Sequence, residues 1–230
     1  MKKSYLAIFF VIVVVAVALF FWFSNPLGSI LKAAIEKFGP EMTQATVRVG
    51  KVNISPTTGQ GGLSGLLVGN PNGFKTDYAL KADNIEVEID VASIAKDVVV
   101  IRRILIDSPH IIYEKGSGGT NFDAIQRNVE QYLGMDRSKG KNADKEPGKK
   151  MIIEVFSIRN AKVSYGAMLD MSLPDIELHN IGKDKGGASS ASVVKSIIGA
   201  VNGKLVSSIA KNVVEGVDKA VKSVGDLFKK

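Results

Sequence analysis

The only two histidines of the chain, His110 and His179, are its first candidates for acid–base or metal chemistry. A metal site would need further ligands close by, and a nucleophilic triad would need a serine beside an imidazole. The two histidines fall on different predicted strands, where each is interpreted as a polar position on a strand face. We therefore predict no catalytic residue and no metal ligand.

A second candidate for chemistry is the group of carboxylates at Glu86, Glu88 and Asp90. Their strict spacing of two residues is typical of the solvated face of a strand rather than of an acid–base pair. The glycine-rich segments 59–62 and 116–119 lack the lysine and hydroxyl residue of a phosphate-binding loop. The chain has no cysteine, which excludes thiol chemistry. These patterns predict a protein that is not an enzyme and that needs no cofactor.

Between the carboxylates lie apolar residues with the same spacing, so segment 85–91 is predicted to be a strand with one apolar face. Similar apolar positions recur in the two strands that follow. Because an apolar sheet face needs a cover, it is predicted either to bind acyl chains or to be sealed by helices. The candidate lipid-binding residues are Ile85, Val87, Ile89, Val91, Ile104, Ile106, Ile111 and Tyr113.

Several strands are predicted to build this face. Val47 and Val49 are odd-numbered whereas Val52 and Ile54 are even-numbered, so a β-bulge near Gly50 is expected. The turn sequence Asn-Pro-Asn-Gly ends the second strand. The strands are predicted at 45–55, 63–68, 85–91, 98–107, 111–114, 152–158, 162–166 and 171–178.

Three amphipathic helices are predicted around the strands. The first begins at Asn25 and Pro26 and ends at Gly39–Pro40. The second covers 121–133. The third is the long C-terminal pattern that begins at Val193, with an apolar residue at every fourth position and lysines elsewhere. It is predicted to lie on the sheet as a lid or in a membrane interface.

The N-terminal segment 5–23 carries no charge and is long enough to cross a bilayer as a helix. Its length favours a retained anchor over a cleaved signal peptide. Lys2 and Lys3 predict a cytoplasmic N-terminus. The net charge of +7 is scattered along the chain, which argues against a nucleic-acid partner and for anionic lipid head groups.

Three stretches, 65–93, 100–122 and 155–182, resemble in their order and spacing the AsmA family. They contain the motifs Gly-Leu-Leu-Val-Gly-Asn-Pro-Asn-Gly-Phe, Ser-Pro-His-Ile-Ile-Tyr and Leu-Pro-Asp-Ile-Glu-Leu-His-Asn-Ile-Gly. The resemblance implies an anchor in the bacterial inner membrane and a periplasmic β domain related to bridge-like lipid-transfer proteins of envelope and outer-membrane biogenesis. It brings no catalytic motif, and this chain has the length of one module.

The sequence thus predicts an α+β fold with a curved, mainly antiparallel sheet of about eight strands. The predicted domains are an anchor at 1–24, a juxtamembrane helix at 25–40, a β domain at 41–185 with a mobile basic loop at 136–150, and an amphipathic helix at 186–230. The first functional hypothesis is a non-enzymatic lipid-binding or lipid-transfer protein with a phospholipid ligand. The alternative is an anchored scaffold that holds a protein partner through the sheet edge or the C-terminal helix.

Overall fold

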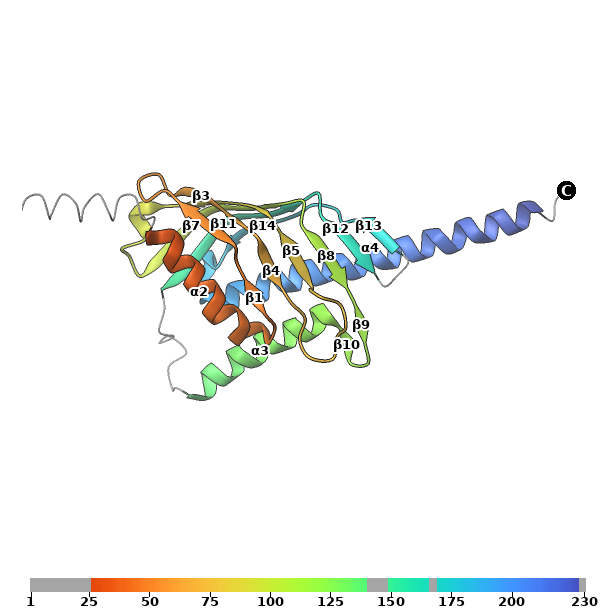
Figure 1. The fold of residues 1–230 in the computed structure, drawn as a ribbon, viewed down its shortest axis with the longest axis horizontal. Helices are drawn as coiled ribbons and strands as arrows, with labels where there is room; N and C mark the ends of the chain where they lie inside the picture. The colour runs from red at the N-terminus through yellow and green to blue at the C-terminus, as the bar shows by residue number, and fades with distance from the viewer. Residues whose placement is uncertain (1–25, 140–148, 166–168, 228–230) are drawn as a thin grey trace, which may run out of the picture.

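A computed structural model describes residues 26–139, 149–165 and 169–227, and their fold is α+β (Figure 1). The helices are α2 (Pro26–Thr43), α3 (Asn121–Lys139) and α4 (Ser190–Leu227), with short 3₁₀ helices η1 (Val91–Ser93) and η2 (Lys183–Lys185). The strands are β1 (Val47–Arg48), β2 (Lys51–Ile54), β3 (Gln60–Ser64), β4 (Leu66–Val68), β5 (Leu80–Ala82), β6 (Asn84–Ile89), β7 (Val98–Asp107), β8 (His110–Tyr113), β9 (Lys115–Gly116), β10 (Gly119–Thr120), β11 (Lys150–Arg159), β12 (Lys162–Tyr165), β13 (Leu169–Ser172) and β14 (Ile176–Ile181).

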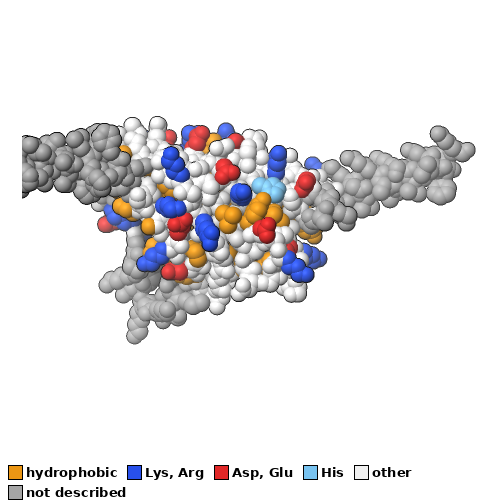
Figure 2. Space-filling view, viewed as in Figure 1, with side chains coloured by type: hydrophobic (Ala, Val, Ile, Leu, Met, Phe, Trp, Pro, Cys, Tyr) orange, Lys and Arg blue, Asp and Glu red, His pale blue; other side chains and the backbone are white. Residues whose placement is uncertain are grey.

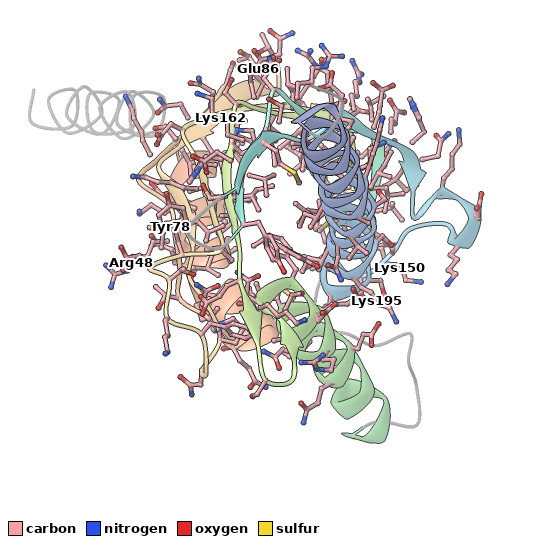
Figure 3. All side chains as sticks on the ribbon, turned by 90° about the vertical axis from the view of Figure 1, so that its right-hand side faces the viewer. Arg48, Tyr78, Glu86, Lys150, Lys162 and Lys195 are labelled. Carbon is pink, nitrogen blue, oxygen red and sulfur yellow. The ribbon has the colours of Figure 1, made fainter. Side chains whose placement is uncertain are left out.

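Twelve of these strands form two six-stranded sheets that are two halves of one bent sheet. The first sheet has the order β1-β4-β5-β8-β12-β13, and the second has the order β2-β3-β6-β7-β11-β14. Each strand of the first sheet adjoins its counterpart in the second through one to three residues. Six long segments therefore cross a common bend, and the sheet forms a trough (Figures 1 and 3). We call the two halves sheet A and sheet B.

The bend is made by residues whose backbones leave the extended region. Gly65 has φ +67°, and Ser108 and Asn160 have φ values of 52° and 53°. Hydrogen bonds continue across the bend, from Ser108 N–H to the Arg159 carbonyl and from Lys162 N–H to the Pro109 carbonyl, both at 2.9 Å. Glycine tolerates positive φ, and the Ser108 and Asn160 side chains both donate to the Asp107 carboxylate at the bend, at 3.1 and 2.8 Å.

Two pairings in the sheets are parallel, which makes both sheets mixed. Strand β7 pairs with β11, and β8 pairs with β12, always between residues 52 positions apart, as for Val98 with Lys150 and Tyr113 with Tyr165. The same bent strand therefore occurs twice, side by side. The predicted count of about eight strands was wrong, because the bend divides the predicted strands 45–55, 63–68 and 171–178 and the short strands β5, β9 and β10 were not predicted.

The concave side of the trough holds the hydrophobic core. Inward-facing strand residues pack there against α3 and α4, as the end-on view in Figure 3 shows. Helix α3 contributes Phe122 and Ile125, and α4 contributes Val201 and Leu205. The apolar inner face of the sheet thus packs against the apolar faces of α3 and α4.

Helix α2 covers the outer edge of the trough at β1 and β2. Glu36 accepts a hydrogen bond from the Val49 N–H at 3.0 Å, and Lys32 donates to the Val49 carbonyl. This pair of side chains, 2.9 Å apart, satisfies backbone groups that would otherwise form an open sheet edge. The first edge is therefore closed by charged side chains of a helix.

The prediction that α2 ends at Gly39–Pro40 was wrong, because the helix continues to Thr43 with Pro40 inside it. A Cβ atom at Gly39 would lie 2.9 Å from Val47, so the glycine permits close contact between α2 and β1. The predicted anchor at 5–23 lies outside the described residues. The predicted loop at 136–150 was wrong at both ends, because α3 continues to Lys139 and β11 begins at Lys150; residues 140–148 lie outside the described residues.

Candidate functional site

The inner wall of the trough contains most of the predicted lipid-binding residues. Ile85, Val87, Ile106, Ile111 and Tyr113 are buried in one core cluster, and Ile89 and Ile104 are half-buried against it. The structure brings these seven together on one face. Val91 lies apart from them, in the 3₁₀ helix η1 after the strand has ended. Its assignment to the wall was wrong, because alternation along the chain holds only while the strand continues.

Helix α4 packs into the same core cluster as this wall. Its inward face contains Val193, Val201, Leu205 and Ile209, and Leu205 is fully buried. The helix also contacts β14, β11 and α3. The apolar wall is therefore in contact with protein side chains where acyl chains were predicted.

Two polar residues of α4, Ser208 and Asn202, are buried. Asn202 binds α3. Its amide donates to Asp123 Oδ1 at 2.8 Å and to Gln126 Oε1 at 3.3 Å, both on α3. The Tyr113 hydroxyl donates to Asn202 Oδ1 at 3.4 Å. These hydrogen bonds fix the position of α4 along α3, because sliding of α4 along its axis would leave buried polar groups unpaired.

Helix α4 is also apolar enough to interact with a membrane. Among the described residues, Ser190–Asn212 is the one helical stretch whose length and hydropathy would allow it to cross a bilayer, and only a third of that stretch is buried. Val206 on its outer side is half exposed. The side chains of the predicted stripe after Asn212 lie outside the described residues. Part of the apolar surface of α4 thus remains unburied.

The carboxylates Glu86, Glu88 and Asp90 lie on the outer face of sheet B, as their spacing predicted. Glu86 pairs with Arg103 at 2.9 Å, while Arg102 lies 3.7 Å from both Glu88 and Asp90. All of these side chains are at least partly exposed. They form cross-strand ion pairs and do not converge on a common site.

The structure brings His110 next to a serine, which the sequence analysis missed. On the outer face of sheet A, His110 Nε2 lies 3.0 Å from Ser164 Oγ, and the serine donates to Asp170 Oδ1 at 2.7 Å. His110 Nδ1 lies 2.8 Å from the Tyr78 hydroxyl. The parallel register of β8 and β12 causes this meeting. The recurrence of a bent strand ending in Tyr113 and Tyr165 was the sequence signal that could have revealed it.

This chain of hydrogen bonds differs from a nucleophilic triad in the order of its members. In a triad, the carboxylate accepts from the imidazole and so orients it toward the serine. Here the carboxylate of Asp170 accepts from Ser164, and a tyrosine lies at the far nitrogen of His110. The second histidine, His179, is elsewhere, beside Glu177 on β14. In the described residues no three His, Cys, Asp or Glu side chains form a metal site.

A polar clamp fixes the Asn-Pro-Asn-Gly turn above the end of the trough. Glu114 accepts hydrogen bonds from the Lys75 N–H at 2.8 Å, from the Thr76 N–H at 2.8 Å and from the Thr76 hydroxyl at 2.6 Å. Asn121 donates to Asn70 Oδ1 at 2.9 Å. Partial burial acts to raise the pKa of Glu114, but the bonds from Thr76 and Lys75 outweigh it and lower that pKa. The turn thus has a structural role.

Comparison with known proteins found no family model and no curated protein sequence that matches this chain. The resemblance to the AsmA family therefore stays a prediction from the motifs.

Proposed function

We propose that this chain is a non-enzymatic, membrane-anchored lipid-binding module in which α4 fills the trough until an acyl chain replaces it. The observation that carries the proposal is the pairing of a continuous apolar wall with a helix that has unburied apolar surface of its own. Each CH₂ group of an acyl chain that enters the trough would contribute about 0.8 kcal/mol. The acyl chain would then take the place of α4 against the wall.

The displaced helix has a second favourable position. An amphipathic helix with lysines on one side can lie in a membrane interface, with its apolar face in the acyl region. Lys195, Lys204 and Lys211 of α4 are not among its buried residues. The predicted anchor would keep the module beside such an interface, in the inner membrane with the domain in the periplasm, as the AsmA resemblance implies.

The test fixes α4 in place and measures bound lipid. Glu130 on α3 and Lys195 on α4 form an exposed ion pair at 3.1 Å, away from the wall. Because the chain has no cysteine, Glu130→Cys with Lys195→Cys can be joined specifically by a short bis-maleimide. We expect native mass spectrometry of the full-length protein to show bound phospholipid before cross-linking and its loss after cross-linking and lipid exchange.

A matched control applies the same chemistry away from α4. Glu86 and Arg103 form a 2.9 Å ion pair on the outer face of sheet B, so Glu86→Cys with Arg103→Cys gives a cross-link that leaves α4 free. Lipid binding should persist in that variant. Equal lipid content in both cross-linked proteins would contradict the proposal.

A second candidate function is the anchored scaffold, and one observation favours it. Five of the eight candidate residues are buried against protein, as in an ordinary core. If the trough is only a core, no phospholipid would accompany any of these variants, and α4 or the β13–β14 edge would hold a protein partner.

A further inference from the structure

A row of basic side chains crosses the outer face of sheet A. The strand register places Lys81 opposite His110, and His110 opposite Lys162, on the three neighbouring strands β5, β8 and β12. The row continues through Leu67 on β4 to Arg48 on β1. Neighbouring strands lie about 4.8 Å apart, so Lys81 and Lys162 begin about 10 Å from each other, with His110 between them. We call Lys81, His110 and Lys162 the basic row.

The basic row points away from the trough. The residues that alternate with it, Ala82, Ile111 and Val163, are buried in the core, and successive side chains of a strand point to opposite faces. Lys81 and Lys162 are exposed. Figure 3 places Arg48, Tyr78 and Lys162 on the side of the sheet opposite to α3 and α4.

The two lysines are not neutralised by partners. In the described part of the chain, the side chains of Lys81 and Lys162 form neither an ion pair nor a hydrogen bond. Asp170 lies on the neighbouring strand β13, and Asp83 lies two residues along from Lys81, but neither carboxylate forms an ion pair with Lys81 or Lys162. The outer face of sheet B differs, because Arg102 and Arg103 there are paired with carboxylates.

Apolar and aromatic side chains accompany the basic row. Leu67 and Ile112 are half-buried on the same face, and Tyr78 is half-buried with its hydroxyl 2.8 Å from His110 Nδ1. Figure 2 shows Lys and Arg side chains, a histidine and apolar side chains on this face, with Asp and Glu side chains between them. Lysines beside a tyrosine and aliphatic side chains match the chemistry of a bilayer surface, with phosphates outside and acyl chains beneath.

We propose that the outer face of sheet A docks on an anionic phospholipid surface through Lys81 and Lys162, which lie on either side of His110. The complementarity is electrostatic, because Lys81 and Lys162 carry positive charge that no ion pair within the described residues neutralises. The apolar neighbours give a shallow contact below the phosphates. This surface lies on the opposite side of the sheet from the trough, so it is independent of lipid binding by the inner wall.

The experiment uses the full-length chain in immobilised nanodiscs of phosphatidylcholine, and measures capture of vesicles that contain phosphatidylglycerol. We compare Lys81→Gln/Lys162→Gln with Lys183→Gln/Lys185→Gln, which removes the same charge from η2 on sheet B. Loss of two lysines at an anionic surface should weaken capture about thirtyfold for the first variant. The control variant should retain capture, and salt should reduce capture by the wild type.

Each other outcome overturns the proposal. Equal weakening in the two double variants would mean that only net charge matters. Equal capture of vesicles with and without phosphatidylglycerol would remove the role of anionic head groups. Binding of soluble polyglutamate that depends on Lys81 and Lys162, without vesicle capture, would assign the surface to an acidic protein. A thermal melt of each variant checks that the fold is intact.

Discussion

Asn202 on α4 and Asp123 on α3 are joined by a 2.8 Å hydrogen bond beneath the open side of the trough. The same carboxylate accepts from the Thr120 N–H and hydroxyl, each at 2.8 Å. Burial acts to raise the pKa of Asp123, yet the hydrogen bonds from Thr120 and Asn202 lower it overall. The position of α4 is therefore tied to the first turn of α3.

Asn202→Ala should loosen α4 without reshaping the wall. The change leaves Gln126 and one oxygen of Asp123 without this partner, so we expect a loss of about 1–3 kcal/mol in unfolding free energy. Chemical denaturation measures it. Ser196→Ala, on an exposed part of the same helix, is the control. If Asn202→Ala changes stability no more than Ser196→Ala does, the amide does not position α4.

The Glu114 clamp gives a pH dependence with a definite sign. Because its pKa in the folded chain is lowered from 4.5, its stabilising contribution is present above about pH 4.5 and is lost as the pH falls through the folded value. The difference in melting temperature between wild type and Glu114→Gln should therefore be largest near neutral pH and shrink in acid. Glu154→Gln, at an exposed position of β11, is the control. A difference that grows on acidification would contradict the clamp.

Alanine substitutions at two glycines with positive φ distinguish the cost of backbone strain from the cost of a steric clash. Gly59 has φ +73°, and a Cβ there would lie 1.9 Å from the Ile89 carbonyl oxygen. Gly73 has φ +100° with open space around it. Gly73→Ala should cost about 1–2 kcal/mol from the backbone alone, and Gly59→Ala should cost clearly more. Equal values in urea denaturation would mean that β3 and β6 do not pack as closely as described.

Neighbouring isoleucines test which face of β8 is the core. Ile111 is fully buried, whereas Ile112 lies on the outer face and is half-buried. Ile111→Ala should lose about 2–5 kcal/mol of unfolding free energy, and Ile112→Ala should lose much less. Because the same substitution is made at two adjacent positions, each variant is the control for the other. A reversed order would place the trough on the wrong side of the sheet.

Local patterns predicted much of the fold. Segment 98–107 is a strand with the predicted bounds, and all four residues around the expected bulge at Gly50 are buried on one face. The change of phase there marks the bend. The sequence of a single strand cannot show that five other strand segments bend at the same place. The parallel pairing of β7 with β11 has no local signal, because it joins residues 52 positions apart.

The candidate site was predicted less completely than the strands. Alternation identified the inner wall through Ile85 and Val87, since side-chain direction in a strand follows from position. It could not show that Leu205 of α4 joins the same core cluster, because an apolar helix stripe matches a sheet and a membrane equally well. The contact between His110 and Ser164 could not be predicted either, because it depends on the parallel register of β8 and β12.

The central claim is that acyl chains contact the inner wall when α4 leaves it. The direct measurement incorporates a phospholipid with a photoreactive group in its acyl chain into vesicles that hold the full-length protein, and maps the labelled peptides after illumination. We predict labelling of 85–89 and 104–113 that is lost when Glu130→Cys and Lys195→Cys are cross-linked. Labelling that stays within 5–23, with none on the wall in either state, would contradict the account.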